Sequence, residues 1–189
     1  MEKTIVQLLV PDLSLLPAYQ RYLATGWSPD NIRTQLVAQK QLEEIACDPA
    51  QFIQSLTDHE GRNPMMELPD GRKIKPLPSL TRWIWAQGFC GAIQLRWRQG
   101  SDELPVHCPG HVGYSIVPER RNQGLATQAM RLLLPIAREV GLHELTIHTK
   151  RSNIASQMVI RKIGGVLVRP LEACADDAID CDLLFKVIL

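Results

Sequence analysis

The sequence has almost no net charge and no long hydrophobic run. Its 21 Lys and Arg residues nearly balance its 20 Asp and Glu residues, which leaves a formal net charge of +1. No global field therefore favours nucleic acid or an anionic membrane as a partner. The most apolar run, residues 132–137, is far too short to span a bilayer. The first residues also lack the pattern of a signal peptide. We therefore expect a cytoplasmic protein that binds neither nucleic acid nor membrane.

Cysteine patterns that would indicate a disulfide framework or a metal site are also missing. The 5 cysteines are odd in number and widely scattered, so we expect reduced thiols. Cys108 stands between His107 and His111, but no second Cys/His pair follows at zinc spacing. We predict a turn there, and no metal.

What the sequence does contain is the composition of a globular domain. Hydrophobic residues make up 45% and charged residues 22% of the 189 positions, enough for one domain with a sizeable core. We predict a single domain over 1–189. Within it we expect a helical part over 1–57, a loop or flap rich in Gly, Pro and charge over 58–79, and the main core over 80–189.

Periodicity and capping signals outline the elements. Ser28 and Pro29 predict the N-cap and first position of one helix, and Gln87-Gly88 predicts a tight hairpin turn. Helices are expected over 15–24, 29–46, 49–56, 125–140 and 153–163. Strands are expected over 4–10, 81–86, 89–97, 110–117, 144–149, 166–169 and 181–188. This order predicts an α/β (α+β) fold around a mixed sheet, with 110–149 as a parallel crossover unit.

The segment from Tyr114 to Thr127 carries the clearest chemical signal. A strand ends at Pro118, a basic turn contains Gly124, and a long amphipathic helix follows. A helix N-terminus offers free N–H groups and a favourable dipole to an anion. Gly124 lets a phosphate approach the backbone, and Arg121 can add charge-assisted hydrogen bonds. An ordinary strand–helix connection explains the same residues equally well.

Two motifs resolve this choice by resemblance. Arg121-x-x-Gly124-x-Ala126 resembles the acyl-CoA signature of the GNAT N-acetyltransferases, and Asn153-x-x-Ser156-x-x-x-Ile160 with Gly164-Gly165 is similar to the family's downstream segment. The resemblance implies a mostly antiparallel sheet whose parallel strand pair splays at the cofactor, and acetyl-CoA as co-substrate. It also implies the following cofactor-binding residues: Ile116, Val117, Arg121, Asn122, Gln123, Gly124, Leu125, Ala126, Thr127, Asn153 and Ser156.

The catalytic half of the site is less readable. The family often has a Tyr at the position of Ile160 to protonate the departing thiolate, and isoleucine cannot do so; Ser156, Tyr114 or water could replace it. His111 is our candidate base because a histidine titrates near neutral pH; the other candidates are Glu103, His107, Glu119 and His148. An N–H around Ile116 or Val117 is the family's usual oxyanion donor.

The hairpin before the cofactor strand suggests an acceptor pocket. Trp83 and Trp85 share one strand face, and with Tyr114 they could line a pocket for an amine. Core packing is the competing interpretation for these aromatics.

We predict an acetyl-CoA-dependent N-acetyltransferase, in which a primary amine attacks the thioester directly in a ternary complex. The acceptor would be a small molecule or a peptide, and the protein a monomer or homodimer. The alternative is a non-catalytic acyl-CoA-binding module, which the missing Tyr at Ile160 keeps open. A P-loop nucleotide site is excluded, because no Gly-Lys-Ser/Thr follows the turn.

Overall fold

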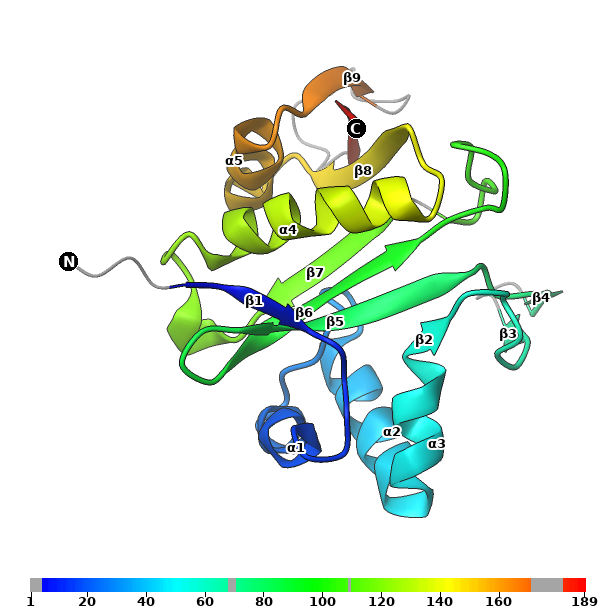
Figure 1. Ribbon diagram of the computed structural model, residues 1–189, viewed down its shortest axis with the longest axis vertical. Coiled ribbons are helices and arrows are strands. Elements are labelled where there is room, and N and C mark those ends of the chain that lie inside the picture. Colours follow the sequence, from blue (N-terminus) through cyan, green and yellow to red (C-terminus); the bar gives the residue numbers. More distant parts are fainter. Residues whose placement is uncertain (1–4, 68–70, 109, 171–181) are drawn as a thin grey trace.

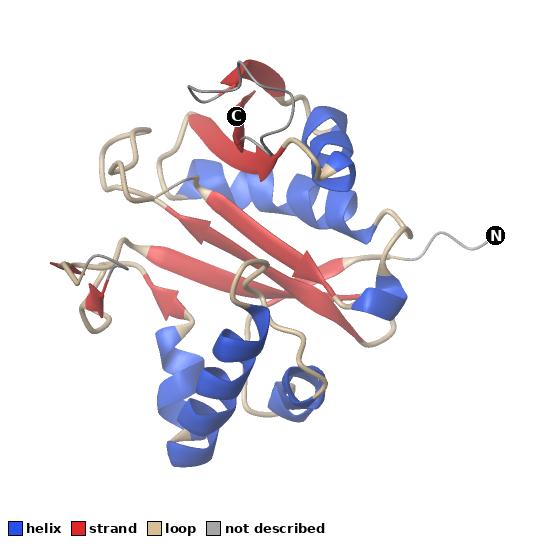
Figure 2. Ribbon diagram, turned by 180° about the vertical axis from the view of Figure 1, so that it is seen from behind, coloured by secondary structure: helices blue, strands red, loops and turns tan. Residues whose placement is uncertain are grey.

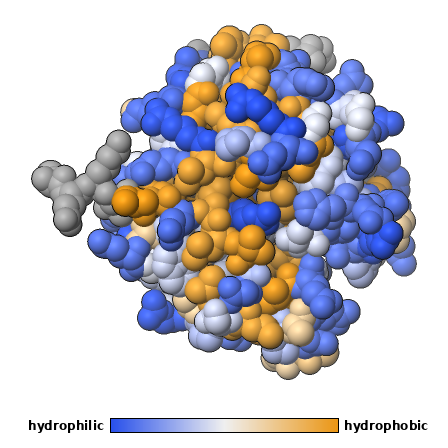
Figure 3. Space-filling view, viewed as in Figure 1, coloured by the Kyte–Doolittle hydropathy of each residue, from blue (hydrophilic) through white to orange (hydrophobic). Residues whose placement is uncertain are grey.

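A computed structural model describes residues 5–67, 71–108, 110–170 and 182–189. Figure 1 shows a central sheet covered by α1, α2 and α3 on one face and by α4 on the other, with α5 and a second sheet beyond α4. No described helix is both long enough and apolar enough to cross a membrane. On the face shown in Figure 3, apolar side chains gather around the middle and polar side chains surround them.

The larger sheet is entirely antiparallel. Its order is β1 (Gln7–Leu9), β5 (Ser79–Trp85), β6 (Phe89–Arg96) and β7 (Val112–Ile116), and β2 (Thr57–Asp58) also pairs with β5. The predicted hairpin turn between β5 and β6 is confirmed: Gln87 and Gly88 both have positive φ, 56° and 132°. The expected loop over 58–79 contains two short strands, β3 (Met66–Glu67) and β4 (Lys73–Ile74), that pair with each other.

The smaller sheet has the order β8 (Glu144–Lys150), β10 (Asp182–Ile188), β9 (Val166–Pro170). β7 and β8 run in the same direction (Figure 2), as the predicted crossover requires, but they do not form a continuous ladder. Two hydrogen bonds of 2.8 Å between His111 and Thr146 join them at the start of β7. Beyond these bonds, the described strands belong to separate sheets.

Each face of the larger sheet has its own core. Along β6, Ile93, Leu95 and Trp97 pack in the cluster that includes α4 (Leu125–Glu139) and Ile160 of α5 (Ile154–Lys162). Trp83 and Phe89 pack in the other cluster, beneath the N-terminal helices. Because side chains alternate along a strand, neighbouring residues of β6 and β7 face opposite layers.

The N-terminal helices are α1 (Leu16–Ala24), α2 (Thr34–Cys47) and α3 (Pro49–Ser55). The prediction that α2 begins at Pro29 is wrong by five residues. The Asp30 carboxylate accepts hydrogen bonds from the N–H groups of Ile32 and Arg33, both 2.7 Å. These local bonds hold a non-helical turn, which competes with helix formation. By contrast, the helix expected over 49–56 does begin at Pro49, because the Asp48 carboxylate caps it by accepting from the N–H of Gln51.

Candidate functional site

The candidate site lies where β7 and β8 separate, next to the start of α4. The backbone between them contains a short 3₁₀ helix, Pro118–Arg120, and then two residues in the left-handed region, Asn122 (φ 61°) and Gly124 (φ 74°). Gly124 is the N-cap of α4 and supplies no side-chain cap. A Cβ at Gly124 would meet nothing within 4 Å, so the space over its backbone is open.

The first turn of α4 therefore presents uncapped N–H groups. The first bond that closes this helix runs from the N–H of Gln128 to the Gly124 carbonyl, at 3.2 Å. The N–H groups before it have no carbonyl four residues back inside the helix. The side chains of Leu125 and Thr127 are buried. These two predicted cofactor residues can therefore contribute only backbone groups.

Side chains of the turn stiffen it and add charge. The Arg121 guanidinium donates from Nε to the Ile116 carbonyl at 3.1 Å, and its side chain is otherwise exposed beside the turn. Gln123 donates from Nε2 to the Glu119 carbonyl at 3.2 Å. Both bonds tie the turn to preceding residues and leave the outer face of the turn to solvent. The arrangement suits a doubly charged anion such as a pyrophosphate.

The second predicted motif begins α5, across the gap from β7. Asn153 is the N-cap of α5, at the start of the helix expected over 153–163, and its Oδ1 accepts from the N–H of Ser156 at 3.0 Å. The hydroxyl of Tyr114, on β7, donates to Ser156 Oγ at 3.1 Å. Burial raises the pKa of Tyr114, so this hydroxyl keeps its proton at neutral pH. Ile160 is fully buried in the core and takes no part in this contact.

The peptide groups of β7 are divided between its two edges. The N–H of Val117 donates to the Cys90 carbonyl on β6 at 3.0 Å, so it is not free to hold an oxyanion. The carbonyls of Tyr114 and Ile116 instead accept from Asn31 Nδ2 and Arg121 Nε. Because peptide groups alternate in direction along an antiparallel strand, the N–H of Ile116 lies on this outer edge, toward the gap.

His111 is buried and held in place. Its Nδ1 accepts from the N–H of Thr146, which puts the proton of the neutral ring on Nε2. Burial lowers the pKa of His111, so the neutral ring is favoured. Neither nitrogen then offers a lone pair to an incoming amine. The prediction of His111 as the base therefore does not fit these contacts. His111 instead joins β7 to β8 by hydrogen bonds.

His148, another candidate base, lies on β8. It is half-buried on the strand face opposite Ile147 and Thr149, which face the α4 side. Burial lowers its pKa too, so the ring is neutral near pH 7. No described hydrogen bond or ion pair occupies its side chain.

Trp83 does not line a pocket. It is 0% exposed and stacks on Tyr19, with ring centroids 5.0 Å apart and an interplanar angle of 18°. Core packing is therefore the correct interpretation for Trp83. Trp85 lies at the margin of the same cluster, partly exposed and edge-on to Phe89.

Sequence reasoning missed the segment that closes the N-terminal side of the gap. Trp27 donates from Nε1 to Ser115 Oγ at 3.0 Å, and Asn31 reaches the Tyr114 carbonyl at 2.8 Å. These partners are more than 80 residues apart along the chain. No local pattern links such residues, so only co-variation between positions would have found them.

No group of three or more His, Cys, Asp or Glu side chains among the described residues could hold a metal ion.

Comparison with known proteins gives one family match. The model of the acetyltransferase (GNAT) domain matches residues 70–166, just over half of the chain. None of the curated proteins matches the sequence.

Solved structures share the fold at low sequence identity. RimL, a ribosomal L7/L12 α-N-protein acetyltransferase in complex with coenzyme A, has 15% identity and a TM-score of 0.62, over 100% of this chain and 96% of that one. The microcin C7 self-immunity acetyltransferase MccE, in complex with acetyl-CoA and AMP, has 13% identity and a TM-score of 0.59, covering 100% and 98%. An acetyltransferase from Agrobacterium tumefaciens has 18% identity and a TM-score of 0.54, covering 100% and 94%. These likenesses confirm the predicted fold class.

Proposed function

Because the chain belongs to the acetyltransferase (GNAT) family, we propose that it moves an acetyl group from acetyl-CoA to a primary amine, by direct attack in a ternary complex. The observation that carries this proposal is the open turn at Asn122–Gly124. It leads into an uncapped helix beside the splayed edge of β7. Pyrophosphate recognition and thioester placement need these two features next to each other.

In this proposal the cofactor lies along the turn and enters the gap. The N–H groups of Gly124, Leu125, Ala126 and Thr127 hold the pyrophosphate, with Arg121 adding charge. Coenzyme A would supply the thioester that is cleaved. Asn153 and Ser156 border the pantetheine arm from α5, opposite Tyr114. The N–H of Ile116 replaces Val117 as the donor to the oxyanion.

The chain's own groups then move the protons. An ammonium is unreactive, so a base must take its proton, and we assign this step to His148. The amine forms a bond to the carbonyl carbon, its nitrogen releases a second proton to water, the carbon–sulfur bond breaks, and the thiolate leaves. Tyr114, hydrogen-bonded to Ser156, can protonate that thiolate in place of the residue missing at Ile160. Much of the acceleration comes from holding the amine and thioester in line.

The acceptor class is a small-molecule or peptide amine. RimL is named as an acetyltransferase of a ribosomal protein, which supports a peptide amine as one of the two kinds of acceptor. The expected cytoplasmic location, and a monomer or homodimer as the working state, belong to the same proposal.

Two measurements test the proposed function. Calorimetry should give tight binding of acetyl-CoA and of coenzyme A, and thiol release across an amine panel should identify an accepted class. Binding of coenzyme A with no turnover on any amine would support the non-catalytic module. Failure to bind coenzyme A at all would reject both readings.

A further inference from the structure

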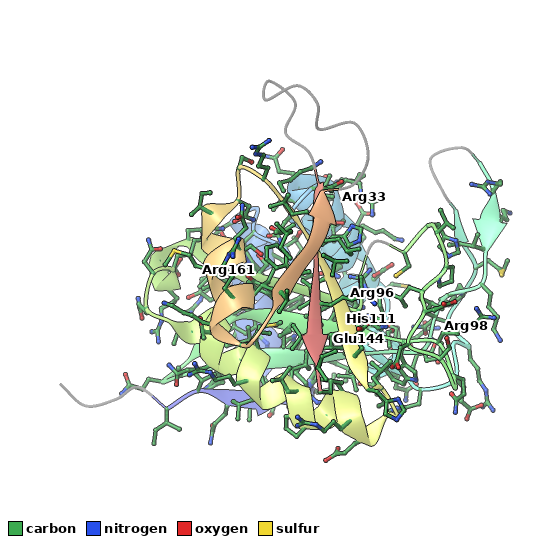
Figure 4. All side chains as sticks on the ribbon, turned by 90° about the horizontal axis from the view of Figure 1, so that it is seen from above. Arg33, Arg96, Arg98, His111, Glu144 and Arg161 are labelled. Atoms are coloured by element: carbon green, nitrogen blue, oxygen red, sulfur yellow. The ribbon has the colours of Figure 1, made fainter. Side chains whose placement is uncertain are left out.

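Arg96 and His111 place two buried hydrogen-bond donors side by side with no partner. Arg96 Nε and His111 Nε2 are both buried, and neither has a hydrogen-bond partner among the described residues. The two residues lie opposite each other, since the backbone N–H of Arg96 donates to the His111 carbonyl at 2.8 Å. Figure 4 shows them together alongside β8, while Arg98 lies out on the following loop. Buried donors normally have partners, so this pair calls for an acceptor.

The neighbouring carboxylates do not supply that acceptor. Asp102 Oδ1 accepts from the N–H groups of His143 and Glu144, and its Oδ2 lies 3.4 Å from the His143 ring. Glu144 is paired with Lys186. No described carboxylate forms an ion pair with Arg96. The half-buried Arg96 guanidinium therefore has no paired carboxylate among the described residues, so an anionic ligand would stabilise it.

The position of Arg96 relates this charge to the reaction gap. Leu95 and Trp97 belong to the core on the α4 side, so Arg96 projects toward the layer of the N-terminal helices. There its Nη2 lies only 3.0 Å from where a Cβ on Gly113 would be. The absence of that Cβ lets the guanidinium lie over β7. Ser115, two residues further along the same face, contacts Trp27 of the N-terminal segment.

We propose that the guanidinium of Arg96, which lies over Gly113 beside the buried His111 ring, binds an anionic group on the acceptor, so that the enzyme acetylates amines that also carry a carboxylate or phosphate. This inference rests on the proposed function, and it adds the chemical class of the acceptor. Gly113 lies three positions before Ile116, the proposed oxyanion donor, along extended strand. The anion and the amine of the acceptor should therefore lie roughly 7–10 Å apart.

The test compares acceptors that differ only in that group. ε-Aminocaproate, its neutral amide and an aminoalkyl phosphonate of equal length are assayed with acetyl-CoA, using the wild-type protein, Arg96→Gln and Arg98→Gln. The wild type should prefer an anionic acceptor in kcat/KM, and the phosphonate arm separates phosphate from carboxylate recognition. In Arg96→Gln, kcat/KM for the anionic acceptor should fall about 10- to 100-fold, the range for a lost charge-assisted hydrogen bond. For the amide, kcat/KM should fall little.

Matched variants separate recognition from folding. Arg98→Gln removes the same charge from an exposed position two residues away and should change neither acceptor. Gly113→Ala keeps Arg96 and shifts its guanidinium by a few tenths of an ångström, so it should weaken the anionic preference slightly without lowering affinity for acetyl-CoA.

Every result decides the inference. Equal turnover of amide and acid by the wild type, or equal losses on both in Arg96→Gln, overturns it while the proposed function stands. If no probe is acetylated although acetyl-CoA binds, calorimetry of each probe with the coenzyme A complex decides. Binding of an anionic probe that Arg96→Gln abolishes supports the inference, and no difference between the two proteins overturns it. Failure of the wild type to bind acetyl-CoA rejects the proposed function itself.

Discussion

The ring of His111 accepts a hydrogen bond from the backbone of Thr146, and the His111 N–H donates one to the Thr146 carbonyl; both are 2.8 Å long. This pair joins β7 to β8 at one end. Gly110 fits beside it because a Cβ there would approach the Thr146 carbonyl to 3.0 Å. The two strands are therefore held together where the chain enters β7 and diverge beyond that point.

The buried His111 ring, which is bonded to Thr146, should make the free energy of unfolding depend on pH. Burial lowers the pKa of His111 below its usual 6.5, while the unfolded chain keeps the usual value. Between the two pKa values the unfolded state binds more protons, so the free energy of unfolding falls as the pH drops below about 6.5. Urea titrations at several pH values should show this fall, with less of it in His111→Gln.

His111→Gln should also lower the free energy of unfolding at pH 7.5 by about 1–3 kcal/mol, because the Thr146 N–H loses its acceptor. His107 is exposed, so His107→Gln should match the wild type at every pH. An unchanged acid slope in His111→Gln would show that this ring is not the group that titrates.

Gly124→Glu should abolish binding of coenzyme A. A carboxylate there stands over the open turn and repels a pyrophosphate, and the left-handed φ of 74° adds strain of about 1–2 kcal/mol. Gly141 is the matched control, since it also has a positive φ of 90° and open space for a Cβ, but follows the other end of α4. Gly141→Glu should lower the free energy of unfolding as much as Gly124→Glu does. It should still bind coenzyme A, as measured by calorimetry. Loss of binding in both variants would reject the turn as the cofactor site.

The sequence was sufficient where a local rule decides the structure. The hairpin at Gln87-Gly88, the cap at Asn153 and the turn at Gly124 follow from backbone preferences of a few residues. The start of α2 was misplaced because Asp30 satisfies two N–H groups locally, an alternative that the Ser-Pro pattern does not reveal.

The contacts that select an acceptor could not be read in this way. Arg96 lies over Gly113 because β6 pairs with β7 in one particular register, and Asn31 reaches Tyr114 only after the N-terminal segment folds over the sheet. Such contacts join residues that are distant in sequence. Pairing register and burial decide them, and neither is encoded in a short motif.

Tyr114→Phe should lower kcat and leave the affinity for coenzyme A nearly unchanged. The variant removes the hydroxyl that donates to Ser156, while the ring keeps its packing. A thiolate is a good leaving group, so the loss should be modest, about 10- to 100-fold. Ser156→Ala keeps the tyrosine hydroxyl and should cost less. If Tyr114→Phe keeps full kcat in thiol-release assays, water rather than Tyr114 protonates the thiolate.

His148→Gln should lower kcat at pH 7 by about 100-fold or more, because no other described histidine on β8 can take the proton from the amine. Burial lowers the pKa of His148, so the wild-type rate should fall only below pH 6.5. His148→Gln should lose this fall in rate at low pH. If the fall persists in His148→Gln, another group is the base. His107→Gln serves as the unchanged control.

Stability and acceptor KM together distinguish a core role of Trp83 from a role in the acceptor pocket. Trp83→Ala removes a fully buried ring stacked on Tyr19 and should lower the free energy of unfolding by about 3–5 kcal/mol in urea titrations. Trp85→Ala should cost less, because Trp85 is partly exposed. Trp83→Phe keeps most of the packing and should leave the acceptor KM unchanged, since the core separates the ring from any ligand. A large rise in acceptor KM in Trp83→Phe, without loss of stability, would restore Trp83 to the acceptor pocket.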